Sequence, residues 1–202
     1  MTTQADYWNH NVHYQPVILG AVPDGCRAAL EVGCGDGLLA RRIAAQAAEA
    51  EVTAIDADAR MIALARERSS GSRVRFVHGD FLACPIEAAS FDFACANTSL
   101  HHMDFVAALR AMARALRPGG GLAVVGLAAN RSPADYLIDV LGVPAHLVYR
   151  VLRGLGGSGA PIKDPEMSWA EVHATARDVL PGVRYRRHLL WRYSLRWTKP
   201  GG

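Results

Sequence analysis

The residues best suited to chemistry lie in one short stretch near the N-terminus, where a carboxylate is followed by alternating glycines. Glu31 lies near the end of the apolar run 28–32, and Gly33, Gly35 and Gly37 come next. Glycine adopts positive φ values freely and has no Cβ, so a ligand can approach its backbone closely. An apolar run, glycines and then a helical pattern are typical of a strand, a tight turn and a helix N-terminus. The stretch predicts a nucleotide-type binding site.

The spacing of these glycines indicates which ligand they suit. A dinucleotide fingerprint, G-x-G-x-x-G, would place a third glycine at position 38, which is Leu38. The stretch 31–37 reads Glu-Val-Gly-Cys-Gly-Asp-Gly and resembles motif I of the class I S-adenosylmethionine (SAM)-dependent methyltransferases. SAM has no pyrophosphate for a loop to hold. Taken alone, the loop is also compatible with a purely structural turn between strand and helix.

A second carboxylate follows the next predicted strand. Asp56 ends the apolar run 52–55, about 20 residues past the glycines, where an acid accepts hydrogen bonds from ribose hydroxyls. The alternative is a helix cap, but Asp58 suits that role better because a helical pattern follows it directly. We expect Ala57 and Met61 beside a bound nucleoside.

The next predicted strand, 74–78, leads into Gly79, Asp80 and Phe81. Asp80 could accept a hydrogen bond from the adenine amino group, and Phe81 could pack against the ring. Asp80 could equally close an Asx turn. Its place on a third successive strand end favours the binding role.

Histidines follow the fourth predicted strand. Asn97 ends that strand, and His101 and His102 come soon after it. If the methyl acceptor is a hydroxyl or an acidic carbon, a base helps to remove its proton. His101, His102, His13 and Tyr14 are the candidates. Adjacent side chains in a turn diverge, so at most one of the histidine pair should face the site, and either could instead only shape the loop.

The resemblance extends over roughly residues 27–128. Phe91-Asp92-Phe93, Leu100-His101-His102 and Arg117-Pro118-Gly119-Gly120 occur in the methyltransferase order and spacing. The nearest subgroup includes the ubiquinone/menaquinone-biosynthesis-like small-molecule methyltransferases. It implies an α/β, Rossmann-like three-layer sandwich with a mostly parallel seven-stranded sheet, ordered 3-2-1-4-5-7-6 and ending in an antiparallel hairpin. The cofactor-binding residues that we expect are Glu31, Gly33, Cys34, Gly35, Gly37, Asp56, Ala57, Met61, Gly79, Asp80, Phe81, Asn97 and Tyr14.

The implied reaction moves the methyl group of SAM to a small, partly apolar acceptor by in-line displacement and leaves S-adenosylhomocysteine. Alignment of the two reactants would supply most of the catalysis. A non-catalytic SAM-binding protein is the alternative. An NAD(P)-dependent oxidoreductase is a weaker one, since no Tyr-x-x-x-Lys pair occurs. A nucleic-acid amino-methyltransferase would need Asn/Asp-Pro-Pro-Tyr where residues 97–100 read Asn-Thr-Ser-Leu.

The elements that must position these residues form one predicted domain, 1–202. We expect an N-terminal segment that covers the cofactor, 1–27, and a SAM-binding core, 28–127. The N-terminal segment could instead only pack against the edge of the fold by burying Tyr7 and Trp8. An inserted substrate lid, 128–166, and a helix with a terminal hairpin, 167–202, follow. The apolar pattern at 132–153 is helical with a break at Gly142-Val143-Pro144, and it suits either a lid or a dimer face.

Local signals fix several element ends. Helices are expected at 38–50, after Asp104, and after Ser168, where Ser168-Trp169-Ala170-Glu171 forms a capping-box pattern. Residues 117–121 should separate a helix from a strand at 122–126. Residues 183–190 and 192–198 alternate as a hairpin.

Composition limits the partners. The chain has 202 residues and a formal net charge of +3, too small to argue for nucleic acid. Its four cysteines form no Cys-x-x-Cys pair, and no metal site is expected. No apolar stretch reaches membrane-spanning length, so we expect no membrane insertion. These features favour a cytoplasmic monomer or homodimer that acts on a small molecule.

Overall fold

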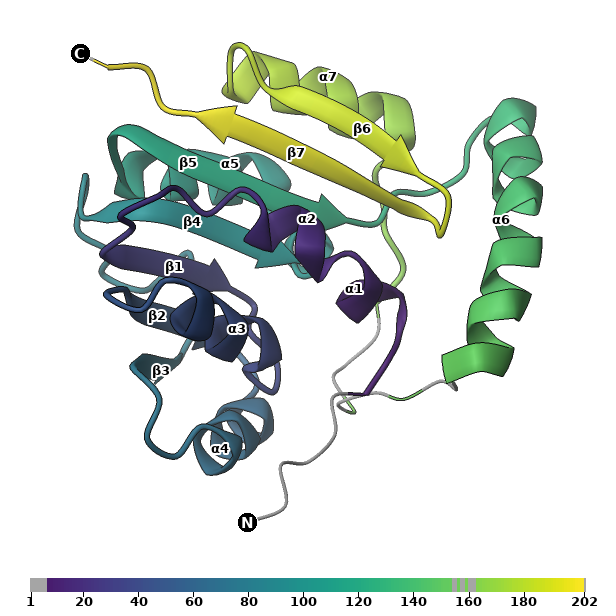
Figure 1. The fold of residues 1–202 in the computed structure, drawn as a ribbon. Coiled ribbons are helices and arrows are strands. Elements are labelled where there is room, and N and C mark those ends of the chain that lie inside the picture. The colour runs from purple at the N-terminus through teal and green to yellow at the C-terminus, as the bar shows by residue number, and fades with distance from the viewer. Residues whose placement is uncertain (1–6, 154–155, 157–158, 160–162, 202) are drawn as a thin grey trace.

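The computed structural model describes residues 7–153, 156, 159 and 163–201 and contains one twisted sheet with helices on both faces (Figure 1). Its strands run in the order β3-β2-β1-β4-β5-β7-β6, which confirms the predicted order. Their bounds are β1 Ala28–Val32, β2 Glu51–Asp56, β3 Val74–His78, β4 Phe91–Asn97, β5 Leu116–Gly126, β6 Arg184–His188 and β7 Arg192–Thr198.

The first five strands are parallel and the last two are not. β1 pairs with both β2 and β4, while β7 lies antiparallel between β5 and β6. The predicted C-terminal hairpin is therefore confirmed. Because the parallel strands all point the same way, the residues that follow β1, β2 and β4 meet at one edge of the sheet.

Helices cover both faces of the sheet, as expected for a three-layer sandwich (Figure 1). The helices are α1 His10–His13, α2 Gln15–Leu19, α3 Leu38–Gln46, α4 Ala59–Arg68, α5 Phe105–Ala115, α6 Pro133–Arg153 and α7 Trp169–Val179, with a 3₁₀ turn at Leu100–His102. α5 and α7 share one apolar core with the sheet, and α2, α3 and α4 share the other.

The predicted helix caps are confirmed. Asp58 accepts a hydrogen bond from the backbone N–H of Arg60, and Asp104 accepts one from Ala107. Ser168 and Glu171 form the reciprocal capping box. Each cap satisfies N–H groups that a helix start leaves without partners.

Two boundary predictions were wrong. Helix α3 ends at Gln46 rather than Ala50. Strand β5 begins at Leu116, so the glycine segment belongs to the strand instead of preceding it. The register shifts there, because Phe91 pairs with Leu116 while Phe93 pairs with Gly121. The extra residues bulge out of the strand, and the backbone of Gly119 and Gly120 bonds to Lys199 beyond β7.

The predicted break inside the inserted segment is also wrong. α6 runs unbroken through Pro144. Proline has no N–H to donate to the carbonyl of Val140, but both residues lie on the exposed side of the helix, so this carbonyl need not be buried without a partner. Several residues of the segment predicted as a lid, 154–155, 157–158 and 160–162, lie outside the described part of the chain. The first six residues of the predicted cofactor-covering segment lie outside it too.

Candidate functional site

A cavity of about 520 Å³ lies at the edge where β1, β2 and β4 end. The glycine turn after β1 and Asp56 at the end of β2 form its floor. The residues after β4 form one wall, and α1 with the chain around it forms the roof. Strand ends on a parallel sheet are where ligands of such folds bind, so the topology alone places a site here.

The glycines of the turn have different reasons to be glycine. All three have positive φ, which glycine tolerates best. A Cβ on Gly33 would lie 2.1 Å from the Cβ of Ser99, and one on Gly37 would lie 2.7 Å from the ring of Phe76. A Cβ on Gly35 would meet nothing within 4 Å, and Gly35 lines the cavity. Gly33 and Gly37 therefore permit packing, while Gly35 keeps its backbone open to a ligand.

Asp56 holds the turn in place and also faces the cavity. Its Oδ2 accepts from the N–H of Gly35 at 2.7 Å, and its Oδ1 accepts from the N–H of Asp58 at 2.8 Å. A carboxylate has about four acceptor positions, so two backbone bonds leave capacity for two ligand hydroxyls. Asp56 can thus fix the loop and a ribose at once.

Glu31 is the most unusual group in the cavity wall. It is 1% exposed, and its Oε2 has no hydrogen-bond partner among the described residues. Burial, and then the charges of Asp36 and Asp56, raise the pKa of this carboxyl well above its usual value. A buried carboxylate oxygen without a partner destabilises the empty protein and suits a cationic donor from a ligand.

The neighbouring Asp36 is already neutralised. Its Oδ2 accepts from Arg68 at 2.6 Å, and the hydroxyl of Tyr7 donates to its Oδ1 at 3.2 Å. The pair with Arg68 is mostly buried. Among the acids near the turn, Glu31 is therefore the one left to pair with a ligand cation.

The wall after β4 carries groups of another kind: Asn97, Thr98, Ser99, His102 and Met103. Thr98 has a φ of 60°, which is rare for a β-branched residue and indicates backbone strain. Burial and the nearby Lys163 lower the pKa of His102, while Asp56 opposes them. His102 is therefore neutral near pH 7 and can accept a proton.

The roof over the cavity is tied to the C-terminal hairpin. Arg192 donates from Nη2 and Nε to Oδ1 of Asn11, at 2.6 and 3.2 Å. The carbonyl of Asn11 accepts from the side chain of Asn97 at 3.3 Å. The buried Arg192 thus links β7, α1 and the end of β4 at the cavity wall.

The structure brings most of the predicted site residues to the cavity. Those that line it are Glu31, Gly33, Cys34, Gly35, Asp56, Ala57, Met61, Asn97 and His102. Gly37, Gly79, Asp80, Phe81, Tyr14 and His101 do not.

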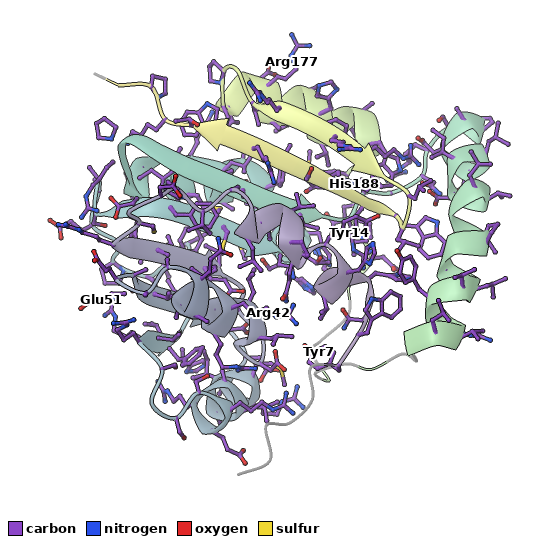
Figure 2. The ribbon with its side chains drawn as sticks, viewed as in Figure 1. Tyr7, Tyr14, Arg42, Glu51, Arg177 and His188 are labelled. Atoms are coloured by element: carbon purple, nitrogen blue, oxygen red, sulfur yellow. The ribbon has the colours of Figure 1, made fainter. Side chains whose placement is uncertain are left out.

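The residues that stay outside the cavity have other partners. Asp80 accepts from the N–H of Leu82, which is the Asx turn, and Phe81 packs in the core. Tyr14 is buried. Its hydroxyl accepts from the N–H of Leu190, and its ring lies 4.9 Å from that of His188 (Figure 2). Tyr14 therefore supports the roof from behind.

The two other candidate bases also lie behind the cavity wall. Burial, and then the charges of His102 and Arg192, lower the pKa of His101 to about 4. Of the adjacent pair only His102 lines the cavity, but the two side chains do not diverge as expected, because their ring centroids lie 4.2 Å apart. His13 packs against the rings of Tyr14 and Tyr149.

Sequence reasoning missed several lining residues: Asn9, Asn11, Gln15, Thr98, Ser99 and Met103. The aromatic and His-rich composition of the N-terminal segment pointed to a cover but not to its amides. Thr98 and Ser99 directly follow a predicted strand end, and this position could have identified them as lining residues. Among the described residues, no group of three or more His, Cys, Asp or Glu is placed to hold a metal ion.

Comparisons with known proteins agree with this geometry. A family described as a methyltransferase domain matches residues 29–120. An uncharacterized methyltransferase of Mycobacterium bovis is 35% identical over 195 residues, which are 96% of this chain and 98% of that protein. The ubiquinone biosynthesis O-methyltransferase of Xanthomonas axonopodis pv. citri is 37% identical over 64% of this chain and 53% of that protein. The structure of a SAM-dependent methyltransferase from Aquifex aeolicus matches with a TM-score of 0.63 at 16% identity, over 94% of this chain and 89% of that one.

The fold and these relatives together define a class I methyltransferase, and the predicted resemblance is confirmed. The chain belongs to the SAM-dependent methyltransferase family.

Proposed function

We propose that the cavity binds SAM and that the protein transfers its methyl group to a small, partly apolar acceptor. The observation that carries this proposal is Glu31, whose unpartnered, buried oxygen lies beside an open glycine turn. SAM has an amino acid ammonium group, a sulfonium and a ribose. Glu31 supplies the charge that the ammonium group needs, and Asp56 supplies acceptors for the ribose hydroxyls.

The remaining cavity residues fit the rest of the molecule. Gly35 lets the backbone approach the ligand, and Ala57 and Met61 border the nucleoside. We do not assign the adenine contacts to Gly79, Asp80 and Phe81, because none of them lines the cavity.

The proposed reaction needs little from the protein beyond alignment. SAM supplies a methyl group on a sulfonium, which is already activated for displacement. Placing two reactants in register can supply about 7–11 kcal/mol of a barrier. The wall with Asn97, Thr98 and Met103 would hold the acceptor in line with that methyl group. His102, neutral near pH 7, would accept the proton from a hydroxyl or an acidic carbon.

The acceptor class rests on the character of the cavity and on the relatives. Val12, Leu38, Leu39 and Met103 give the cavity apolar walls among its polar groups. Partial relatives carry names that refer to small molecules, among them demethylmenaquinone methyltransferase and 27-O-demethylrifamycin SV methyltransferase. We therefore propose a small acceptor with an apolar part, in the cytoplasm, rather than a nucleic acid.

A calorimetric titration tests the proposal. The purified protein is titrated in parallel with SAM, S-adenosylhomocysteine and NADH. Micromolar binding of the first two, with none of the third, is the expected result. Binding of NADH alone would overturn the interpretation of the glycine turn. If the protein binds none of the three, the interpretation of the cavity is wrong.

A further inference from the structure

Helix α6 is amphipathic, but its polar side faces the protein. Asp135, Asp139, Gly142, His146 and Tyr149 are spaced alternately by four and three residues, so they lie on one face. That face is the one in contact with the rest of the molecule, while Figure 1 shows α6 standing at one side, apart from the sheet. A surface helix of a globular protein normally has the opposite arrangement.

Ion pairs hold the first half of the helix. Arg187 of β6 bonds to Asp135 at 2.7 Å and to Asp139 at 3.1 Å. Its guanidinium carbon lies 3.8 Å from the ring centroid of Trp169. The indole N–H of Trp191 donates to the carbonyl of Asp139. Both acids of the helix are therefore used in docking it and contribute no free negative charge to its outer side.

Aromatic contacts hold the second half and connect it to the roof of the cavity. His146 bonds to His10 of α1 at 2.9 Å, and Tyr149 stacks on Trp8 with ring centroids 5.3 Å apart. The carbonyl of Trp8 accepts from the N–H of Gly156, which lines the cavity. The helix thus contacts the N-terminal segment that forms the roof of the cavity.

The outer face of α6 is apolar along its whole length. Val151 is 82% exposed, Leu152 74% and Leu137 67%. The exposed apolar residues of the helix are Tyr136, Leu137, Ile138, Val140, Leu141, Val143, Leu147, Val148, Val151 and Leu152. Water is an unfavourable neighbour for so large a continuous apolar surface, and such patches mark interaction sites.

We propose that this outer face of α6 binds a lipid surface, with the helix parallel to the membrane plane and its apolar side chains among the upper acyl chains. No helix of the described chain is long and apolar enough to span a membrane, and the proposed contact is shallow. The proposed contact is therefore compatible with the expectation that no segment of the chain inserts across a membrane, because only side chains of α6 enter the lipid interface.

The shape of the face favours lipid over a second copy of the chain. The 21-residue helix is about 32 Å long, and its outer side forms one convex ridge. A single convex helix also fits a fluid surface without the matching groove that a protein partner would have to provide.

The charges near the face also favour lipid. The exposed charged side chain described on α6 is Arg150, near its C-terminal end, and the whole chain carries a formal net charge of +3. Because both acids of the helix are turned inward, the outer side offers nothing that anionic headgroups would repel.

Vesicle flotation tests the proposal. The full chain is mixed with phosphatidylcholine vesicles and, separately, with vesicles of three parts phosphatidylcholine to one part phosphatidylglycerol. We expect the protein to float with both, somewhat more with the anionic ones, and to stay bound at 0.5 M NaCl because the contact is mainly apolar. The triple variant Leu141→Gln, Val148→Gln, Leu152→Gln leaves the charge unchanged and keeps good helix formers. It should lose binding more than tenfold.

The matched control is Leu82→Gln, another exposed leucine, located after β3 and away from α6. It should float like the unaltered protein. Circular dichroism and SAM titration of all variants report whether they are folded. If the unaltered protein stays in the aqueous phase with both vesicle types, or the folded triple variant still floats, the proposal is overturned. If light scattering shows a dimer that the triple variant converts to a monomer, without flotation, the occupant is a second copy instead.

Discussion

Replacing Glu31 with Gln should stabilise the empty protein and weaken SAM binding. The substitution keeps the shape of the side chain and removes its charge. The carboxyl of Glu31 is buried, one of its oxygens has no partner among the described residues, and its pKa is raised mainly by burial. An unsatisfied buried polar group costs about 1–3 kcal/mol. Recovering about 1 kcal/mol would raise the Tm by about 2–4 °C for a domain of this size.

The stability effect should depend on pH in a defined direction. Between the ordinary pKa of a glutamic acid and the raised pKa of Glu31, the folded protein holds one more proton than the unfolded chain. Raising the pH through this window therefore favours unfolding. The Tm of the unaltered empty protein should fall as the pH rises above about 4.5, and the variant should lack this contribution. The difference in Tm between Glu31→Gln and the unaltered protein should therefore widen as the pH rises.

Although Glu31→Gln should stabilise the empty protein, it should weaken the binding of SAM. If Glu31 pairs with the ammonium group of SAM, losing a charge-assisted hydrogen bond costs about 1.5–3 kcal/mol, or roughly 10–150-fold in Kd. Calorimetry gives the Kd, and thermal unfolding with and without SAM gives the Tm.

Glu51→Gln is the matched control, because Glu51 is exposed and lies at the opposite end of β2 (Figure 2). It should change neither quantity. Unchanged SAM affinity together with a lower Tm in Glu31→Gln would refute the reasoning, since Glu31 would then be a structural group.

Three further predictions concern single side chains. Asp56→Ala should raise the Kd for SAM more than tenfold by calorimetry, and an unchanged Kd would show that the ribose lies elsewhere. His102→Ala should leave SAM affinity nearly intact while reducing methyl transfer to any hydroxyl acceptor, and a large loss of affinity would move His102 to the cofactor side. Partial burial raises the pKa of Asp135, but hydrogen bonds from Ser132 and Arg187 outweigh it and lower that pKa to about 2. Asp135→Asn should therefore lower the Tm at pH 7 by about 2–4 °C. The difference from the unaltered protein should disappear as the pH falls from about 4 towards 2, and a Tm gap that persists at pH 2 would contradict the charge as its cause.

The local parts of the fold and site followed from the sequence because short-range chemistry determines them. The caps at Asp58, Asp104 and Ser168 each depend on bonds spanning two or three residues. The turn at Gly33 depends on glycine's freedom at positive φ, and strand ends on a parallel sheet converge whatever lies between them. The strand order came from family resemblance rather than from the residues themselves.

The parts that could not be predicted depend on contacts between distant segments. Nothing local to Asn11 shows that it meets Arg192, which lies 181 positions later. The unbroken course of α6 depends on exposure at Pro144, which a one-dimensional pattern does not reveal. Asp80 lies on a strand end like Asp56, yet it closes a turn, so the same local signal had two outcomes.

The link between Asn11 and Arg192 also has a consequence for folding kinetics. Helix α1, which forms the roof, and strand β7, which anchors it through Arg192, lie near opposite ends of the chain. Strand β7 inserts between β5 and β6. Contacts of such long sequence separation form late, because the loop between them must close first. During synthesis the five parallel strands can assemble before Arg192 has been made, but the roof cannot be fixed. Competence to bind a ligand should therefore be the last property that the growing chain acquires.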